Sequence, residues 1–295
     1  MLCAIAFGCG CGDDNCTPAP GVAPDVDPVF AMQMAEEHVA LGPRVAGTDG
    51  AARAADWIAQ KMMGSGKFAL SLDVWQENGK TFRNVEAVYR SQMNSGKFVV
   101  VGAHYDTKAL SSVPDFQGAN DGASGVAALL AMTKAIPDRS PLPFDVIFLF
   151  FDGEEALYEY NDHDGLHGSK RFVGKMKSPA DCIAMILLDM VGDQDLNVRF
   201  PADTDAGLLN AALTVSGRNG TLAQFNSGGS VMLDDHIPFQ KLGIPAIDII
   251  DFSYGPYNSY WHTKYDTLDR ISGKSIAASA DFALDLIWEL AEKQK

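Results

Sequence analysis

Cysteine is scarce in this sequence once the first sixteen residues are set aside. Four of the five cysteines lie at positions 3, 9, 11 and 16, which leaves Cys182 for the rest of the chain. Cys182 stands inside an apolar stretch, and this predicts a buried thiol that behaves as a small hydrophobic side chain. The body of the protein is therefore expected to fold without a disulfide. The amino-terminal cysteines also lack the regular paired spacing of a structural zinc site.

Positive charge is scarce as well. The chain has 23 lysines and arginines against 38 aspartates and glutamates, a formal net charge of −15. A nucleic-acid-binding protein needs cations that neutralise phosphates, so this imbalance argues against that class. No apolar run approaches the length of about 20 residues that a helix needs to cross a bilayer, so no transmembrane span is predicted. The hydrophobic content of 47% is ordinary, and 295 residues suit one large domain.

The first 27 residues differ in composition from the remainder. Residues 1–7 are apolar, a stretch rich in glycine and cysteine follows, and residues 17–27 are rich in proline, alanine and aspartate. One interpretation is a bacterial export signal with an imperfect lipobox, Ala6-Phe7-Gly8-Cys9, followed by a flexible tether. It predicts a location in the bacterial cell envelope, either periplasmic or tethered by a lipid anchor at Cys9. The alternative is a disordered leader with incidental cysteines, because the basic segment that normally opens an export signal is missing.

From residue 28 onward, segments with helical periodicity alternate with short apolar segments typical of strands. These strands are nearly continuous in apolar residues, as in a parallel sheet that is covered on both faces. Asn78-Gly79 separates the first two and is typical of a β-hairpin turn. The sequence thus predicts a single α/β domain over residues 28–295, with a central, mainly parallel mixed β-sheet flanked by helices. The predicted strands are 70–76, 84–90, 97–103, 145–151, 182–188 and 245–250, and the predicted helices are 28–41, 51–63, 125–136, 168–176, 205–216 and 275–293.

One of the predicted strands ends in two adjacent carboxylates. The apolar run of residues 146–151 stops at Asp152-Gly153 and is followed at once by Glu154 and Glu155. In open α/β sheets the functional site lies beyond the carboxyl ends of the strands. Two neighbouring glutamates at that position can have different roles, since one can bind a metal ion while the other transfers protons. An isolated Gly-Glu-Glu would more simply be a solvated turn, so this interpretation depends on the other strand ends.

Polar residues that could join this pair follow the other predicted strands. Each of them alone would be explained as an N-cap, a turn residue or a hydrogen-bonded histidine. Together they bring histidine and carboxylate side chains to the same edge of one sheet. Nitrogen and oxygen ligands without thiolates match a catalytic zinc site. The residues are His104 and Asp106 after the third strand, Asp121 at a helix start, Asp189 after the fifth strand and His262 in the loop after the sixth.

In order along the chain, these segments resemble the motifs of the zinc aminopeptidase clan known as the M28 family, and within it those of the glutaminyl cyclases. The resemblance covers roughly residues 41–276 and implies the α/β/α sandwich of a zinc aminopeptidase. The motifs are Gly-Ala-His-Tyr-Asp106-Thr-Lys, Gly-Ala-Asn-Asp121-Gly-Ala, Phe-Phe-Asp-Gly-Glu154-Glu155-Ala, Leu-His-Gly168-Ser-Lys, Leu-Leu-Asp189-Met-Val-Gly, Asp234-Asp-His-Ile-Pro-Phe and Trp261-His262-Thr.

Two features favour the cyclases over the peptidases of this family. Residues 156–167 form an insert before the Gly-Ser motif, and it is similar to the cyclase loop that helps to enclose the pocket. The segment that begins at Asp234 and the tryptophan directly before His262 are also similar to those of cyclases. At two positions the chain differs from the animal glutaminyl cyclases. Tyr160 stands in the insert where they have a pocket tryptophan, and Asp248 stands where they have a histidine, although an aspartate there resembles bacterial members.

Applied to this chain, the resemblance implies one zinc ion whose ligands are Asp121, Glu155 and His262. Glu154 would be the general acid/base beside that ion. In the peptidases of the family a second zinc ion is bound, and His104 and Asp189 would complete its site here. One zinc ion is therefore expected for a cyclase and two for an aminopeptidase.

The resemblance also implies roles around the substrate. Asp189 and Asp234 would form a carboxylate pair that shares a proton, so at least one of their pKa values should be raised. Trp261 would form an apolar wall for the glutamine side chain, and Tyr160 would face the same pocket. His236, two residues after Asp234, is expected to have a structural role.

The expected function is that of a zinc-dependent glutaminyl-peptide cyclotransferase. Such an acyltransferase converts the N-terminal glutamine of a peptide or protein to pyroglutamate and releases ammonia. The alternative is an aminopeptidase with two zinc ions, in which Glu154 activates a water molecule. A third candidate is a catalytically silent, membrane-tethered protein that binds peptides, and the complete set of predicted ligands disfavours it.

Overall fold

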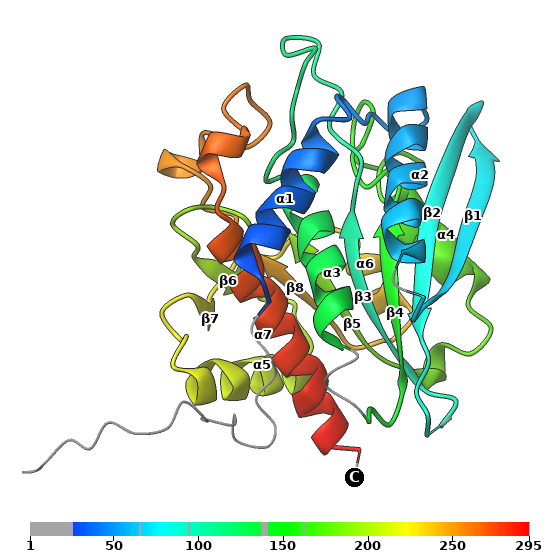
Figure 1. The fold of residues 1–295 in the computed structure, drawn as a ribbon, viewed down its shortest axis with the longest axis vertical. Coiled ribbons are helices and arrows are strands. Elements are labelled where there is room, and N and C mark those ends of the chain that lie inside the picture. Colours follow the sequence, from blue (N-terminus) through cyan, green and yellow to red (C-terminus); the bar gives the residue numbers. More distant parts are fainter. Residues whose placement is uncertain (1–25, 65, 94, 137–140, 162, 295) are drawn as a thin grey trace, which may run out of the picture.

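A six-stranded sheet forms the centre of the protein (Figure 1). The computed structural model describes residues 26–294 apart from 65, 94, 137–140 and 162, so most of the predicted leader, with Cys9, lies outside the described residues. The strand order in the sheet is β1-β2-β4-β3-β5-β8. The strand bounds are β1 Ala69–Glu77, β2 Lys80–Tyr89, β3 Phe98–His104, β4 Asp145–Phe151, β5 Cys182–Asp189 and β8 Ala246–Ile250.

Strand direction divides the sheet into two parts. β2 pairs antiparallel with β1 and with β4, whereas β4, β3, β5 and β8 pair parallel. Asn78 and Gly79 join β1 to β2 with φ angles of 52° and 75°, and Asn-Gly tolerates two positive φ angles in a row. The parallel strands are apolar over most of their length because both of their faces are buried. The predicted mixed, mainly parallel sheet is confirmed.

Helices cover both faces of this sheet. Alternate residues of β3 face opposite sides of the sheet, since Val99 and Val101 pack in one hydrophobic core and Val100 packs in another. The first core contains residues of α1 (Pro28–Val39), α2 (Asp49–Met63), α3 (Ala123–Ala135), α5 (Ala206–Asn219) and α7 (Gly273–Glu292). The second contains residues of α4 (His167–Lys175) and α6 (Ile237–Lys241), and also Cys182, which is a buried free thiol as predicted. The predicted α/β/α sandwich is thus confirmed.

Short elements between β5 and β8 were not predicted. β6 (Val198–Phe200) and β7 (Phe225–Ser227) form a separate parallel pair, and α6 has only five residues. Three residues are too few to display the alternation that identifies a strand, so the sequence pattern could not reveal β6 or β7. Longer elements were predicted to within a few residues. The last helix, for example, begins after Ser272, whose side chain caps it by accepting the Lys274 N–H.

The parallel strands place their carboxyl ends at one edge of the sheet. His104 ends β3 and pairs in register with Phe151 at the end of β4. Asp189 ends β5 and pairs with Ile250 at the end of β8. The loops that follow these four strands therefore begin side by side, and they carry the residues predicted for the site.

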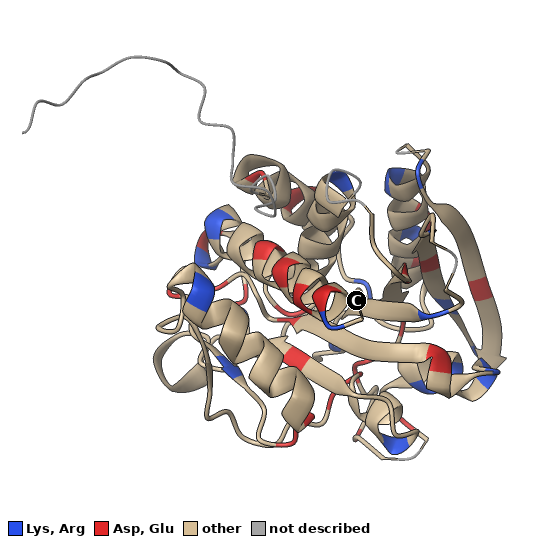
Figure 2. Cartoon of the chain, turned by 90° about the horizontal axis from the view of Figure 1, so that it is seen from below, with Lys and Arg blue, Asp and Glu red and all other residues tan. Residues whose placement is uncertain are grey.

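Acidic residues occur throughout the fold and recur along α7, the helix that ends near the C-terminus (Figure 2). Some of them are paired, since Arg218 Nη1 lies 3.1 Å from Glu289 Oε2. Within the part of the chain that the structure describes, no helix combines the length and the apolarity needed to cross a bilayer.

Candidate active site

Three residues from distant parts of the chain meet beyond the ends of β3 and β4. Asp121 precedes α3, Glu155 follows β4, and His262 lies in the loop after β8. The His262 Nε2 atom is 2.8 Å from Glu155 Oε1 and 3.1 Å from Asp121 Oδ2. One ligand atom of each residue lies within 4.8 Å of the other two, so the three can share one metal ion. The structure thus brings together the three ligands that the sequence resemblance implies.

A second group shares Asp121 with the first. His104 Nε2 lies 3.2 Å from Asp121 Oδ1 and 3.2 Å from Asp189 Oδ1. Asp121 therefore turns one oxygen toward each histidine. Burial alone would raise the pKa of Asp121, but hydrogen bonds to His104 and His262 and their charges outweigh burial and lower it. The residues predicted for a second metal ion are also close enough to share one.

The donor set of the first group fits a divalent cation. Burial, and after it the charge of Glu155, raises the pKa of Glu154 well above its usual range. Burial and the charge of Asp121 likewise raise the pKa of Glu155. Asp121 Oδ2 is buried, and its contact among the described residues is His262 Nε2 at 3.1 Å. A cation bound by two carboxylates and one imidazole would compensate these charges, and this combination of ligands is typical of catalytic zinc.

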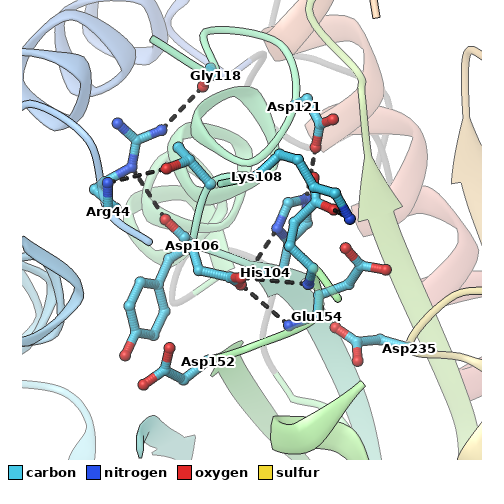
Figure 3. A network of polar contacts seen from close by, with 12 residues as sticks. Arg44, His104, Asp106, Lys108, Gly118, Asp121, Asp152, Glu154 and Asp235 are labelled. Atoms are coloured by element: carbon cyan, nitrogen blue, oxygen red, sulfur yellow. Dashed lines mark hydrogen bonds and ion pairs between the residues drawn. The ribbon is translucent and has the colours of Figure 1, made fainter. Parts of the chain in front are cut away.

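Main-chain hydrogen bonds orient the glutamate pair. The N–H of Glu154 donates to Asp106 Oδ1 at 3.1 Å and the N–H of Glu155 donates to Asp106 Oδ2 at 3.3 Å (Figure 3). Gly153 makes the preceding turn with a φ of 71°, and a Cβ there would lie 2.8 Å from the Phe82 ring. Asp106 is fully buried. Its carboxylate therefore fixes the start of both glutamate side chains, in addition to lying beside His104 as predicted.

The loop that carries Asp121 is held by two buried charged residues. The Arg44 guanidinium is fully buried and donates to the carbonyl oxygens of residues 117 and 118 at 3.0 Å each (Figure 3). The Asp266 carboxylate accepts the N–H groups of residues 120 and 121 at 2.7 and 3.2 Å. Neither Arg44 nor Asp266 lies at a strand end, so no sequence pattern marked these two residues as part of the site.

Tyr160 and Lys108 also contact the glutamate pair. The Tyr160 hydroxyl lies 3.0 and 3.2 Å from the two carboxylate oxygens of Glu154 and 3.2 Å from Glu155 Oε2. Lys108 Nζ lies 3.3 Å from the same Glu155 oxygen. Glu155 therefore directs Oε1 toward His262 and Oε2 toward Tyr160 and Lys108. The sequence predicted Tyr160 as a pocket residue but did not predict the contact of its hydroxyl with the two glutamates. Lys108 was missed, although it is the one cation in the motif that follows the third strand.

A further set of acidic side chains borders the same site. Burial, followed by the charges of Asp248 and Asp189, raises the pKa of Asp234 well above its usual range. Asp234 also lies close to His236, which is 1% exposed and whose ring nitrogens have no hydrogen-bond partner among the described residues. Burial lowers the pKa of His236 to about 4, so this imidazole is neutral near pH 7.

The glutamates open into a cavity of about 160 Å³. Its lining includes the carboxylates of Asp189 and Asp234 together with aromatic and aliphatic side chains. Trp261 stacks on His262 with ring centroids 4.0 Å apart, and the Phe252 ring lies 5.0 Å from Trp261. Trp261 remains 37% exposed, so it stands at the mouth of the cavity. Such a cavity can hold a small group with an apolar stem and a polar end.

The fold and the site together define a class of protein. A mainly parallel α/β/α sandwich with carboxylate and imidazole ligands beyond its strand ends is typical of zinc-exopeptidase-like metalloenzymes. The chain belongs to peptidase family M28, whose model matches residues 84–287. The resemblance seen in the sequence motifs is therefore confirmed.

Relatives of known structure or activity include glutaminyl cyclases. The glutaminyl-peptide cyclotransferase of Drosophila melanogaster is 29% identical over 217 residues, which are 64% of this chain and 60% of that protein. The crystal structure of an Acidobacteriales bacterium glutaminyl cyclase is 28% identical, with a TM-score of 0.83 over 95% of this chain and 99% of the other. A Zn-dependent exopeptidase from Parabacteroides distasonis is 26% identical, with a TM-score of 0.75 over 90% of this chain and 99% of the other.

Proposed function

We propose that the protein is a glutaminyl-peptide cyclotransferase that uses a single zinc ion. The observation that carries the proposal is the small cavity above Glu154, which Tyr160 from the insert and Trp261 help to enclose. A cavity of this kind suits one N-terminal side chain. The similarity to a bacterial glutaminyl cyclase over nearly the full length of that structure supports the same conclusion.

The metal site would consist of Asp121, Glu155 and His262. When bound there, zinc supplies Lewis-acid polarisation of the substrate amide oxygen. Lys108 holds the Glu155 oxygen that faces away from His262, and this contact keeps the other oxygen turned toward the histidine.

The reaction is an intramolecular aminolysis. The free α-amine of the N-terminal glutamine attacks the carbon of its own side-chain amide, so a new C–N bond forms while the bond to the amide nitrogen breaks. Glu154 accepts a proton from the amine and gives a proton to the departing nitrogen, which leaves as ammonia. Because nucleophile and electrophile belong to one residue, the cavity has mainly to hold them in a near-attack conformation.

The remaining residues of the cavity would orient the substrate. Trp261 provides an apolar wall for the methylene groups of the glutamine side chain. Asp189 and Asp234 provide carboxyl groups beside Glu154, and the raised pKa of Asp234, caused by burial and then by the charges of Asp248 and Asp189, favours the protonated form of Asp234. A protonated carboxyl group can donate a hydrogen bond to a reacting nitrogen or oxygen.

Ammonia release tests this proposal. A synthetic peptide that begins with glutamine should release one ammonia per molecule when it is incubated with zinc-loaded protein. The same peptide with an acetylated α-amine should release none, because the nucleophile is blocked. Equal release from both peptides would show that the α-amine is not the nucleophile and would contradict the proposal.

One observation favours a second candidate, an aminopeptidase with two zinc ions. His104, Asp121 and Asp189 are as close together as the first group, so a second ion has a complete set of ligands. Metal analysis of the purified protein separates the candidates, since one zinc per chain supports the cyclase and two support the peptidase.

The sequence of the first 27 residues supports a location in the bacterial cell envelope, with a lipid anchor at Cys9. If this proposal is correct, the wild-type protein fractionates with membranes and a Cys9→Ser variant becomes soluble. Identical fractionation of the two proteins would contradict it.

A further inference from the structure

Tyr160 presents a polar group to the site as well as an aromatic wall. Its hydroxyl reaches both oxygens of Glu154, at 3.0 and 3.2 Å. A phenol has one proton to donate, and a carboxylate oxygen is a good acceptor for it. A residue that served only as a wall would need the ring without the hydroxyl.

The insert holds Tyr160 in this position. The N–H groups of residues 157, 158 and 159 all donate to the Asp164 carboxylate, at 2.8, 2.8 and 3.1 Å. Gly165 has a φ of 81°, and a Cβ there would lie 2.6 Å from the Tyr160 ring. On another side, Lys108 Nζ lies 5.0 Å from the ring centroid. These contacts restrict the phenol, so its hydroxyl is pre-organised beside Glu154.

We propose that Tyr160 is a positioning residue for the proton transfer. Its hydroxyl donates a hydrogen bond to one carboxylate oxygen of Glu154 and leaves the other oxygen directed at the α-amine. This role depends on the proposed function, because it assigns a task to Tyr160 within that reaction. It also explains why the insert has the contacts that fix an aromatic ring carrying a hydroxyl.

Removal of the hydroxyl alone tests the role. Tyr160→Phe should lower kcat about 10- to 100-fold, the range expected for loss of one hydrogen bond to a charged group, and leave KM within about twofold. Zinc content should not change, since Tyr160 contacts the ligand Glu155 only at the oxygen that Lys108 also contacts. The matched control is Tyr158→Phe in the same insert, because Tyr158 is 92% exposed, and it should retain wild-type kinetics.

A second readout does not require turnover. In protein labelled with ¹³C at tyrosine Cζ, the Tyr160 signal is the one absent from Tyr160→Phe, and it should shift in Glu154→Gln. An unchanged kcat in Tyr160→Phe, or an unshifted signal, would overturn the proposal. A raised KM with unchanged kcat in Tyr160→Phe would also overturn it, because Tyr160 would then only help to bind the substrate. A wild-type protein that releases no ammonia would instead refute the proposed function, and the labelled signal would still report the hydrogen bond.

A second cavity adjoins the first and supports an independent inference. It has a volume of about 210 Å³ and shares Met232, Ile250 and Phe252 with the cavity above the glutamates. Residues 228–230 line it together with part of β6. Gly229 approaches β6 so closely that a Cβ there would lie 2.3 Å from the Arg199 carbonyl oxygen. The two cavities therefore adjoin each other at these three shared side chains.

Arg199 gives this second cavity its charge. Its guanidinium donates to the carbonyl oxygens of Val198 at 2.9 Å and Ala223 at 3.4 Å. Among the described residues, no carboxylate lies within ion-pair distance of it, although the chain has a net charge of −15. An arginine with unused donors can bind a carboxylate of another molecule.

We infer that this cavity binds the residues that follow the N-terminal glutamine and that Arg199 favours an acidic residue there. A peptide whose glutamine fills the first cavity must continue past its rim, and Met232 and Phe252 line the second cavity as well as the first. This specificity rests on the proposed function and adds a preference for acidic peptides to it.

The test compares two peptides that differ only in glutamate or lysine directly after the glutamine. Wild-type kcat/KM should favour the glutamate peptide about three- to fivefold, and Arg199→Met should bring the ratio near one. The control is Arg218→Met, because Arg218 pairs with Glu289 away from both cavities, and it should keep the wild-type ratio. An unchanged ratio in Arg199→Met would overturn the inference. Glutamine amide has no residue for the second cavity, so its failure to react with the wild type would refute the proposed function instead.

Discussion

Glu154 and Glu155 are adjacent in the chain, but their surroundings differ. Glu155 Oε1 faces His262 at 2.8 Å and belongs to the group that can hold a metal ion. Glu154 faces the cavity and accepts its side-chain hydrogen bond from Tyr160. The turn at Gly153 and the Asp106 carboxylate direct the two side chains apart. In the proposed mechanism, a single strand end thereby supplies one metal ligand and one group that transfers protons.

Replacement of Glu154 by glutamine tests this difference between the two residues. Glu154→Gln should lower kcat by at least about 100-fold, because glutamine cannot exchange the proton, while zinc content stays at the wild-type value. The measurements are turnover of a glutamine peptide and metal analysis of the same sample. Glu159→Gln in the exposed part of the insert is the matched control and should retain full activity. Full activity in Glu154→Gln would remove Glu154 from the mechanism.

The sequence could predict the strand-end residues of the site but not the contacts that hold them. His104, Glu155 and Asp189 follow apolar strands directly, and parallel strands bring such residues to one edge. Arg44, Lys108 and Asp266 act through carbonyl and amide groups or carboxylates in loops far away in sequence. Their roles depend on how those loops fold over the sheet, which no local pattern records.

At the scale of elements, the parallel strands position the site because they pack without gaps. Gly102 lies in the middle of β3 between β4 and β5. A Cβ at this position would lie 2.4 Å from Phe151 Cε2 and 3.0 Å from the methyl carbon of Met185. The absence of a side chain thus allows Phe151, the last residue of β4, to lie beside β3 next to the site.

Gly102→Ala should therefore destabilise the protein by about 1–3 kcal/mol, as overpacking of a core usually does. Denaturation in urea measures the change in the free energy of unfolding. Gly174→Ala in α4 is a suitable control, because a Cβ there meets no neighbour within 4 Å and alanine favours a helix. Equal stability of wild type and Gly102→Ala would show that Phe151 can move without cost.

The length and the periodicity of an element decide whether the sequence could predict it. Long helices and fully apolar strands have clear periodicity, so α7 and β4 were placed to within two residues. β6 and β7 are too short for any periodicity, and they are recognised as strands by their parallel pairing with each other. The insert has no regular structure over most of its length, and its position depends on the Asp164 carboxylate and the contacts of Lys108.

At the scale of the whole molecule, the concentration of buried acids predicts that stability depends on a bound metal ion. Asp121, Glu154 and Glu155 are all nearly inaccessible, and no arginine or lysine other than Lys108 lies within ion-pair distance of them among the described residues. A bound divalent cation would compensate these charges in the folded state only. Binding to the folded state alone stabilises a protein in proportion to the logarithm of ligand concentration.

Chelation should therefore lower the Tm by about 5–10 °C, which corresponds to the loss of a tightly bound ligand in a domain of this size. Addition of zinc should restore it. Glu154→Gln keeps all three ligands, so chelation should lower its Tm as much as that of the wild type. Glu155→Gln lacks one ligand, so chelation should change its Tm little. A wild-type Tm that chelator leaves unchanged would contradict the assignment of a metal to this site.

The most direct test of the proposed activity is mass spectrometry of one peptide that begins with glutamine, after incubation with the zinc-loaded protein. Cyclisation predicts a product that has lost one ammonia and keeps every residue. The Glu154→Gln variant, treated in parallel, should leave the peptide unchanged. Loss of the whole first residue by the wild type would contradict the cyclase proposal and establish an aminopeptidase, with His104 as a ligand of a second metal ion.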